Sequence, residues 1–143
     1  MARVWALLAF LCLTFSIEAN ASGGTARIEN GYLYVKCSTC SSYRYVWSSV
    51  KTFDVDGDAL AFTTNDNYIY VLGDLEAGSP RYLWSDVKSF AFSATSLAFV
   101  TTSDYLYSLN DLASGSPRYL WSNVDTYVVD GDALAFVTRD GYL

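Results

Sequence analysis

A block of about 37 residues occurs three times in this chain, and this repetition limits the folds open to it. The pattern Arg-Tyr-(Val/Leu)-Trp-Ser recurs at residues 44–48, 81–85 and 118–122. A second pattern, (Ala/Ser)-Leu-Ala-Phe, recurs with the same spacing. Repeats of this length form structural units that pack against their neighbours, so three similar units in series are expected.

Each unit predicts four short β-strands and no helix. Residues 50–55 alternate apolar and polar side chains, as a half-buried strand does, and residues 59–63 form a short apolar run. Residues 68–72 are rich in β-formers, and 81–84 form the fourth segment. No segment keeps apolar residues at helical spacing. The predicted fold is therefore all-β, with about three four-stranded, propeller-like blades that need not complete a ring; a β-trefoil is the alternative.

The first 21 residues have the pattern of a secretory signal peptide. Arg3 is followed by an apolar run over residues 4–17, and Ala19-Asn20-Ala21 is a small-x-small cleavage site. The run is short for a membrane-spanning helix, and no other run approaches that length, so membrane insertion is not expected. The division is therefore signal peptide at 1–21 and β-repeat domain at 22–143, in a secreted, extracellular protein.

Cys37 and Cys40 are the two cysteines outside the predicted signal peptide. Secretion favours a local disulfide between them, with a free or intermolecular pair and redox activity as the alternatives. A zinc site would need about four ligands, and the sequence has no His and no second Cys pair. These two residues stand in a loop that is one residue shorter than its counterparts in the other units.

The sequence ends on the Gly-Tyr-Leu that also occurs at residues 31–33, where the first copy continues to Tyr34 and Val35. One interpretation is that the start of the chain completes a blade in the same chain or in a partner chain, as a homo-oligomer that closes a ring. The other is that the domain is truncated at residue 143 and further repeats follow. Ending inside a predicted strand favours the second.

Composition argues against several classes of function. The net charge of −6 repels nucleic-acid phosphates, and no basic patch offsets it. Without His, the commonest general base is absent, and no catalytic residues are predicted. Closely spaced carboxylates, of which Asp56 and Asp58 are examples, fall at Asp-Gly turns, where Asp is favoured for backbone reasons. Weak calcium binding is the alternative there, and no metal site or cofactor is predicted.

The recurring aromatic residues are the best candidates for a binding site. Strand alternation would place the Tyr and Trp of each Arg-Tyr-x-Trp-Ser segment on one face, where they either pack in the core or form a platform for sugar rings. A solvated edge or a cross-blade ion pair is the alternative role of the Arg. Tyr residues at 32 and 34, and at equivalent positions, share a face as well. The predicted ligand-binding residues are Arg44, Tyr45, Trp47, Arg81, Tyr82, Trp84, Arg118, Tyr119 and Trp121.

The order Trp-x-x-Val, Phe-x-Val-x-Gly, Leu-Ala-Phe-x-Thr and Asp-x-Tyr-Leu-Tyr resembles the repeats of tectonin-type and tachylectin-type β-propellers. The resemblance covers residues 26–143. It implies a propeller fold and a lectin-like function, since members of that family are often secreted or defensive lectins. The sequence departs from the family pattern in its Arg-Tyr-Leu-Trp-Ser segments and in having about three units, where such rings have five or six.

The expected function is therefore non-enzymatic recognition of a glycan or extracellular polymer through repeated aromatic and polar sites. Repetition favours this, because weak sites in series gain avidity. The alternative is an acidic, tyrosine-rich structural protein of an extracellular or mineralised matrix. Sugar-competed retention on a glycan column would distinguish the two.

Overall fold

The computed structural model describes residues 17–20 and 23–141, which form antiparallel sheets and contain no helix. The predicted all-β fold is confirmed. Blade 1 contains β1 (Ile17–Asn20), β2 (Thr25–Glu29), β3 (Tyr32–Lys36) and β4 (Arg44–Ser48). Blade 2 contains β5 (Val50–Asp56), β6 (Ala59–Thr64), β7 (Ile69–Leu72) and β8 (Arg81–Trp84). Blade 3 contains β9 (Val87–Phe92), β10 (Leu97–Thr101), β11 (Leu106–Leu109) and β12 (Arg118–Trp121), and blade 4 contains β13 (Val124–Asp130) and β14 (Ala133–Thr138).

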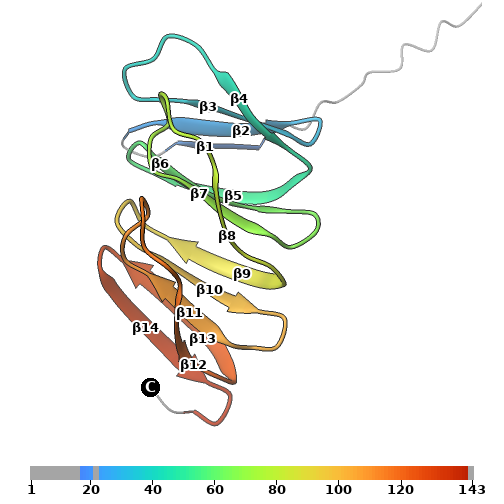
Figure 1. Cartoon of the computed structure of the whole chain (residues 1–143), viewed down its shortest axis with the longest axis vertical. Helices are drawn as coiled ribbons and strands as arrows, with labels where there is room; N and C mark the ends of the chain where they lie inside the picture. The colour runs from blue at the N-terminus through green and yellow to red at the C-terminus, as the bar shows by residue number, and fades with distance from the viewer. Residues whose placement is uncertain (1–16, 21–22, 142–143) are drawn as a thin grey trace, which may run out of the picture.

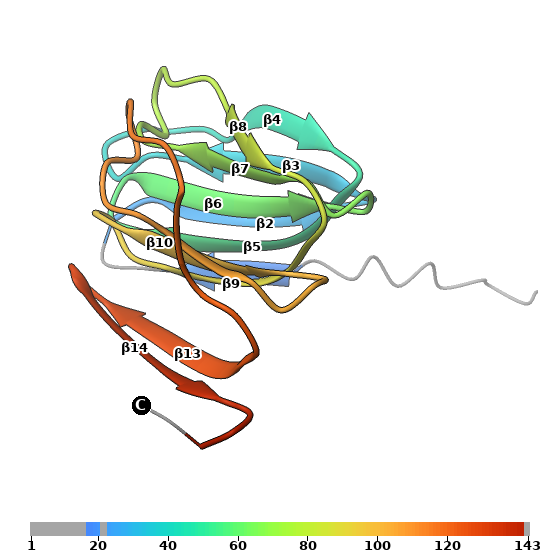
Figure 2. The same cartoon turned by 60° about the horizontal axis from the view of Figure 1, so that its bottom comes forward.

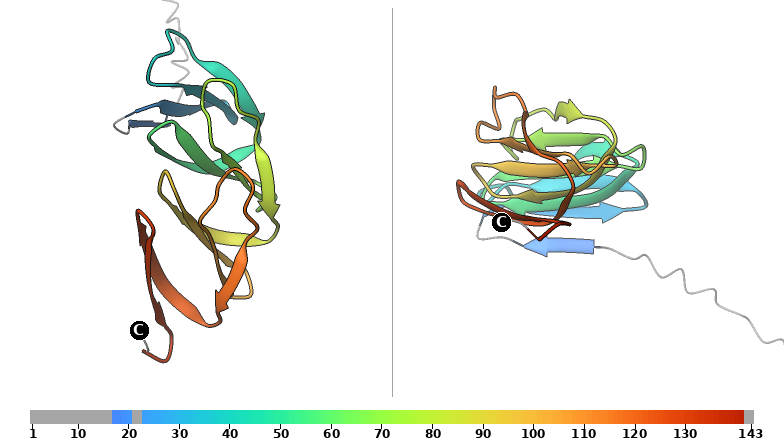
Figure 3. Two further views of the ribbon diagram at one scale, coloured as in Figure 1. Left: turned by 60° about the vertical axis from the view of Figure 1, so that its left-hand side comes forward. Right: turned by 90° about the horizontal axis from the view of Figure 1, so that it is seen from below.

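The four sheets stack face to face along the long axis of the molecule, from blade 1 at the top of Figure 1 to blade 4 at the bottom. The first strands of consecutive blades contact one another, β5 against β9 and β9 against β13. Figure 2 brings β13 and β14 forward and shows them at one end of the stack. The left view in Figure 3 shows the described blades one after another in an open series. This is the serial, blade-on-blade packing of a β-propeller rather than the alternative β-trefoil.

Apolar residues fill each boundary between blades. In blade 2, one face of the sheet points to blade 1 and buries Leu60 and Phe62, while the other points to blade 3 and buries Ala59 and Ala61. Blade 3 repeats this arrangement, with Phe99 fully buried. Complete burial of a Phe side chain stabilises the fold by about 2–3 kcal/mol. The continuous apolar run predicted at 59–63 is therefore a strand covered on both faces.

A short backbone connection of the same kind joins each blade to the next. Ser49, Asp86 and Asn123 occupy the three connections, and each has a positive φ of 55–57°. The residue after each of them begins the first strand of the next blade, where its N–H donates to a carbonyl of the preceding blade's turn, as Val87 does to Asn67 at 2.9 Å. Left-handed backbone is tolerated best by Gly, Asn and Asp, which explains two of the three residue types found here.

Part of the predicted signal peptide lies in the first sheet. β1 pairs with β2 in an antiparallel register that places Ala19 opposite Ala26. The predicted cleavage site after Ala21 lies outside the described residues, and cleavage there would separate β1 from the rest of blade 1. No helix in the described part of the chain is long and apolar enough to cross a membrane.

Candidate functional site

A β-bulge in each complete blade separates the Tyr and Trp that the sequence placed on one face. Leu33 pairs with Trp47 and Tyr34 pairs with Tyr45, so Val46 is an extra residue between the two pairs. The same shift occurs between β7 and β8 and between β11 and β12. Because neighbouring residues of β3 point to opposite faces, Tyr45 and Trp47 do as well. The shared face expected from simple alternation is therefore wrong.

The Trp side chains pack across blade boundaries. Trp47 lies 4.9 Å from Tyr70 and 6.2 Å from Phe62 of the next blade, measured between ring centroids. Trp84 has the same relation to Tyr107 and Phe99. Trp121 contacts Phe136 alone among the described rings. These contacts match the packing alternative from the sequence, although Trp84 and Trp121 remain 37% and 53% exposed.

Two of the three Arg residues hold the loop of the following blade. The Arg44 guanidinium donates to the carbonyls of Leu75 and Gly78, both at 2.8 Å. Arg81 donates to the carbonyls of Leu112 at 2.9 Å and Gly115 at 2.8 Å. We call this arrangement the Arg latch. The sequence suggested a cross-blade ion pair as one alternative role of these Arg residues. The Arg latch does cross the blade boundary, but its partners are backbone carbonyls rather than carboxylates.

The loop whose carbonyls accept from the Arg latch is held in shape by hydrogen bonds to its Asp side chain. In blade 3, the Asp111 carboxylate accepts hydrogen bonds from the backbone N–H groups of Ala113 and Ser114 and from the Ser114 hydroxyl. These bonds, the hydroxyl's foremost, hold the pKa of Asp111 below its usual value. The Gly115 N–H donates to the Asp111 carbonyl, which closes the loop and presents the Gly115 carbonyl to Arg81.

The Tyr residues form a cluster of three on each complete blade, which we call the tyrosine triad. The triads are Tyr32/Tyr34/Tyr45, Tyr68/Tyr70/Tyr82 and Tyr105/Tyr107/Tyr119. In blade 2, the Tyr82 ring lies edge-on to Tyr68 and Tyr70, with centroid distances of 5.9 and 5.7 Å. The triad therefore brings together one predicted site residue and two that the predicted set omits. Their period of two in the sequence was the signal for them, and their expected shared face is confirmed.

Exposure within the triads repeats closely from blade to blade. The Tyr of the fourth strand is exposed by 54%, 52% and 52% in Tyr45, Tyr82 and Tyr119. The first Tyr of each triad is exposed by 41–46%, and the second is half-buried. Burial is the largest cause that raises the pKa of the Tyr70 phenol, which therefore stays protonated at neutral pH and keeps its O–H donor. Each complete blade thus presents aromatic faces and phenol hydroxyls to solvent.

A surface pocket also recurs once per complete blade, beside the Arg of the fourth strand. The pocket at Arg118 has a volume of about 380 Å³ and is lined by loop residues that include Asn110, Asp111 and Ser116. The pockets at Arg44 and Arg81 occupy equivalent positions, with volumes of about 420 and 330 Å³. None of the tyrosine triad residues lines these pockets, so the predicted Arg and Tyr residues belong to different surfaces. Ligand binding by the nine predicted residues remains a prediction.

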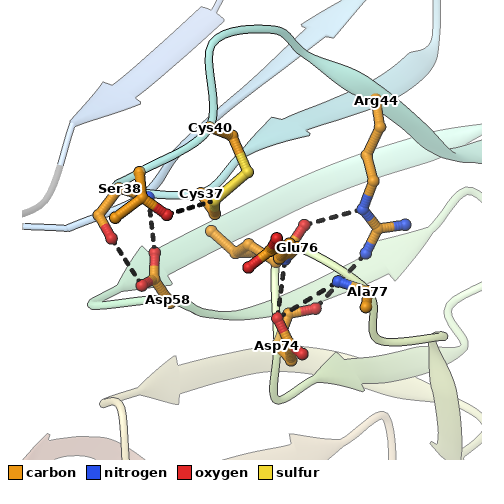
Figure 4. The surroundings of a disulfide bond; sticks show 10 residues. Cys37, Ser38, Cys40, Arg44, Asp58, Asp74, Glu76 and Ala77 are labelled. Carbon is orange, nitrogen blue, oxygen red and sulfur yellow. Dashed lines mark hydrogen bonds between the residues drawn. A yellow bond between two sulfur atoms is a disulfide. The ribbon is translucent and has the colours of Figure 1, made fainter.

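The disulfide joins Cys37 to Cys40 beside the pocket of Arg44. Figure 4 shows how this loop is attached to blade 2, where both oxygens of the Asp58 carboxylate accept hydrogen bonds from Ser38, one from its N–H and one from its hydroxyl. Asp58 belongs to the Asp-Gly turn between β5 and β6, which the sequence predicted. Its carboxylate therefore connects blade 2 to blade 1. Among the described residues, no group of acidic or Cys side chains is arranged to hold a metal ion.

Other Asp residues of these turns also reach across boundaries. The Asp56 carboxylate accepts from the Ala94 N–H at 2.9 Å, and the Asp132 carboxylate accepts from the Thr95 hydroxyl at 2.8 Å. Burial, with the nearby charge of Asp56 as a smaller cause, raises the pKa of Asp54 above its usual value. The carboxylates stand at successive blade junctions, which fits their predicted role in turns.

Comparison with known proteins identifies the fold. No family model and no curated protein sequence matches the chain. Among solved structures, human WBSCR16 matches with a TM-score of 0.68 and 12% identity, over 89% of this chain and 46% of that one. Prp20p from Saccharomyces cerevisiae, whose structure was determined with its binding properties to Gsp1p and histones, matches with a TM-score of 0.66 and 12% identity, over 94% of this chain and 45% of that one.

A third match is PorZ, a bacterial surface component of the type-IX secretion system of Porphyromonas gingivalis, with a TM-score of 0.53 and 12% identity over 79% of this chain and 17% of that one. The chain thus spans less than half the length of the solved structures to which it is similar. At these identities the likeness concerns the fold, and it does not single out tectonin-type or tachylectin-type proteins. The chain is built from β-propeller blades.

Proposed function

We propose that this is a secreted, non-enzymatic protein that binds glycans through its tyrosine triads. The observation that carries the proposal is that the fourth-strand Tyr of every triad keeps just over half of its surface exposed in all three complete blades. A residue that served only to fill the core would be buried. Aromatic faces that stay open beside phenol hydroxyls suit the C–H faces and hydroxyls of sugar rings.

The triad geometry supports this use. In each complete blade the fourth-strand ring is edge-on or tilted to its two neighbours, at centroid distances of 5.7–6.2 Å. These contacts fix the ring while one face stays open, so little side-chain entropy is lost when a sugar binds. Because the triads repeat along the stack, a polymer with a repeating sugar could engage several of them, and weak sites would combine into useful avidity.

The pockets beside the Arg residues could add a second kind of contact. Each offers side-chain hydroxyls, carbonyls or carboxylates beside an Arg, which suits sugar hydroxyls or an acidic sugar. The Arg44 and Arg81 guanidinium groups donate to backbone carbonyls, whereas Arg118 donates no hydrogen bond to another described residue. We therefore assign the main role to the triads.

A glycan-array screen followed by triad variants tests the proposal. Tyr82→Ala should weaken binding to an array-positive polysaccharide several-fold, and the triple variant with Tyr45→Ala and Tyr119→Ala should abolish it. Tyr82→Phe is the matched control, because it keeps the ring and removes only the hydroxyl. An array without hits would refute glycan binding. Self-association together with retention on mineral or polymer that free sugar does not release would favour the alternative, a structural protein of an extracellular matrix.

A further inference from the structure

A pocket of about 320 Å³ lies between the first strands of blades 2 and 3. The two strands beside it, β5 and β9, contact each other and belong to four-stranded blades. None of the residues that line the pocket belongs to a tyrosine triad or to the Arg latch. Its volume falls in the range of small-molecule sites, which is about 300–1,000 Å³. The pocket is therefore a second candidate site, separate from those described above.

Blade 2 contributes three polar side chains to one wall of this pocket. Asp54 pairs with Ala61, which packs in the boundary with blade 3, and residues paired across two strands share a face of the sheet. Thr52 and Thr63 pair with each other on the same face, and their hydroxyl oxygens are 2.9 Å apart. Since one hydroxyl donates to the other, the two together keep one O–H donor and free lone pairs for a third group.

The polar character of this wall departs from the repeat. The equivalent residues of blade 3, which face blade 4, are Ser89, Ala91 and Val100. The fold therefore accepts Ala and Val where blade 2 has Asp54 and Thr63. Thr63 is only 5% exposed, and a buried hydroxyl has no advantage over an apolar group in packing. Packing between blades does not explain why these two residues are polar.

The aromatic ring on the opposite wall lacks a hydroxyl that its counterpart has. Phe90 packs against the core between blades 2 and 3, and Tyr127 occupies the equivalent position in blade 4. The Tyr127 hydroxyl lies 2.8 Å from the hydroxyl of Ser89, the counterpart of Thr52. Among the described residues no phenol bonds to Thr52, which is paired with Thr63 instead. The pocket thus places an apolar ring opposite hydroxyl groups and leaves room for a ligand oxygen between them.

The carboxylate in the pocket calls for hydrogen-bond donors. In the described part of the chain no Lys or Arg forms an ion pair with Asp54. Partial burial raises the pKa of Asp54, which means that its charged form is less well solvated than that of a free carboxylate. Ligand hydroxyls would supply donors to this group, and hydrogen bonds to a charged acceptor are stronger than those between neutral groups.

The rim of the pocket favours an anionic ligand. Lys51 and Lys88, two of the three lysines in a chain with a net charge of −6, both line it. The Lys51 ammonium donates to the neutral Asn67 amide, and Lys88 shares the Asp104 carboxylate with Arg139. Each ammonium group has three N–H donors, so both keep donors for an acceptor on the ligand.

We propose that this pocket binds a sugar acid, which is a hydroxylated ring that carries a carboxylate. The C–H face of the ring packs on Phe90. One ligand hydroxyl bonds to the Thr52 and Thr63 hydroxyls, where a phenol oxygen lies at the next boundary, and another donates to Asp54. The ligand carboxylate accepts from the two lysines of the rim. This site goes beyond the glycan binding proposed for the tyrosine triads and does not rest on it.

NMR titration of the isotope-labelled protein tests the ligand class. Galacturonate and glucuronate are the probes, and galactose and glucose are the matched neutral sugars. A uronate should cause saturable shifts in the amide signals of residues 51–54 and 88–90. The matched neutral sugar should bind about tenfold more weakly, because it lacks the charged hydrogen bonds to the lysines. An oligomer of the same uronic acid then distinguishes a residue of a polysaccharide from the free acid.

A single oxygen atom locates the site. Phe90→Tyr adds a hydroxyl that would occupy the place of the ligand oxygen, and it should lower uronate affinity about tenfold or more. Tyr127→Phe is the matched control, because it removes the equivalent oxygen at the next boundary, and it should leave uronate affinity unchanged. Asp54→Ala and Thr63→Val introduce the residues that blade 3 carries, so the fold should tolerate them while uronate affinity falls several-fold. Thermal melting of each variant checks the fold.

The outcomes that contradict the proposal are distinct. Absence of any shift with both uronates would exclude the site, and equal uronate affinity of wild type and Phe90→Tyr would place the ligand elsewhere. Equal affinity for a uronate and its neutral sugar would overturn the ligand class. Tyr82→Ala separates this proposal from the proposed function, because it should weaken glycan binding by the triads and leave uronate binding intact. Loss of uronate binding in Tyr82→Ala would assign the acid to the triads instead.

Discussion

Replacement of Arg81 by Ala should destabilise the protein, and the structure allows the size of the effect to be worked out. The guanidinium makes two short hydrogen bonds, at 2.9 Å to the Leu112 carbonyl and 2.8 Å to the Gly115 carbonyl. It also makes two longer contacts at 3.3 and 3.4 Å. Hydrogen bonds to a charged group contribute about 1.5–3 kcal/mol each when well formed, and exposure to solvent reduces this. We expect the free energy of unfolding to fall by about 2–3 kcal/mol.

Arg118 supplies a matched control within the same repeat. It stands at the same place in its blade but donates to no described carbonyl, so Arg118→Ala should change the free energy of unfolding by no more than about 0.5 kcal/mol. Arg81→Lys should recover only part of the loss, because an ammonium group cannot span two carbonyls as the planar guanidinium does.

Equilibrium unfolding in urea, followed by Trp fluorescence, measures the difference. With an m-value of about 1–3 kcal/mol/M, a loss of about 2–3 kcal/mol should lower the midpoint of Arg81→Ala by about 0.7–3 M. Hydrogen exchange should accelerate in the loop at residues 111–115 first, since that loop loses its anchor. Equal destabilisation by Arg81→Ala and Arg118→Ala would refute the reasoning, because it would show that loss of positive charge, and not loss of the carbonyl contacts, governs stability.

Three further predictions concern the loops and one ion pair. Gly78→Ala should destabilise by at least about 1 kcal/mol in urea unfolding, because a Cβ at Gly78 would lie 2.5 Å from the Asp74 carbonyl oxygen; an unchanged midpoint would contradict this. The hydrogen bond from Lys88 and the charge of Arg139 lower the pKa of Asp104. The ionised carboxylate therefore stabilises the fold above about pH 4, and this contribution is lost as pH falls through the folded-state pKa. Asp104→Asn should make the melting temperature fall less steeply with decreasing pH in this acid range. Reduction of the disulfide should lower the free energy of unfolding by no more than about 2 kcal/mol, because the loop it closes is short, and a larger loss on adding reductant would mean that the bridge does more than restrain a turn.

The strands were largely predictable from the sequence. Residues 50–55, 59–63, 68–72 and 81–84 were expected as strands, and the structure places strands at Val50–Asp56, Ala59–Thr64, Ile69–Leu72 and Arg81–Trp84. Alternation and turn residues are local signals, and they survive in the fold because every blade uses the same hydrogen-bonding pattern. The face on which each aromatic residue lies was less predictable, since a single bulge residue reverses the alternation beyond it.

For the candidate site, too, the residues could be predicted from the sequence but their partners could not. The sequence identified the recurring Arg, Tyr and Trp residues as one set, but their partners lie in other blades. Arg44 meets carbonyls about 30 residues further along the chain, and Trp47 meets Phe62 and Tyr70. No local pattern encodes which carbonyl a guanidinium will reach, because that depends on how two sheets pack.

The all-β class, the repeat length, the strand positions and the cysteine pair follow from the spacing and type of side chains along the chain, because these features act locally. The packing of the blades was needed to separate three roles within each repeat: Trp lies at the blade boundary, Arg binds the loop of the following blade, and Tyr is exposed to solvent. It also revealed that equivalent residues differ in exposure, since Trp84 is 37% exposed and Trp121 is 53% exposed. The physical reason is that burial and hydrogen bonding at a blade boundary depend on the neighbouring sheet, and identical segments differ wherever that neighbour differs.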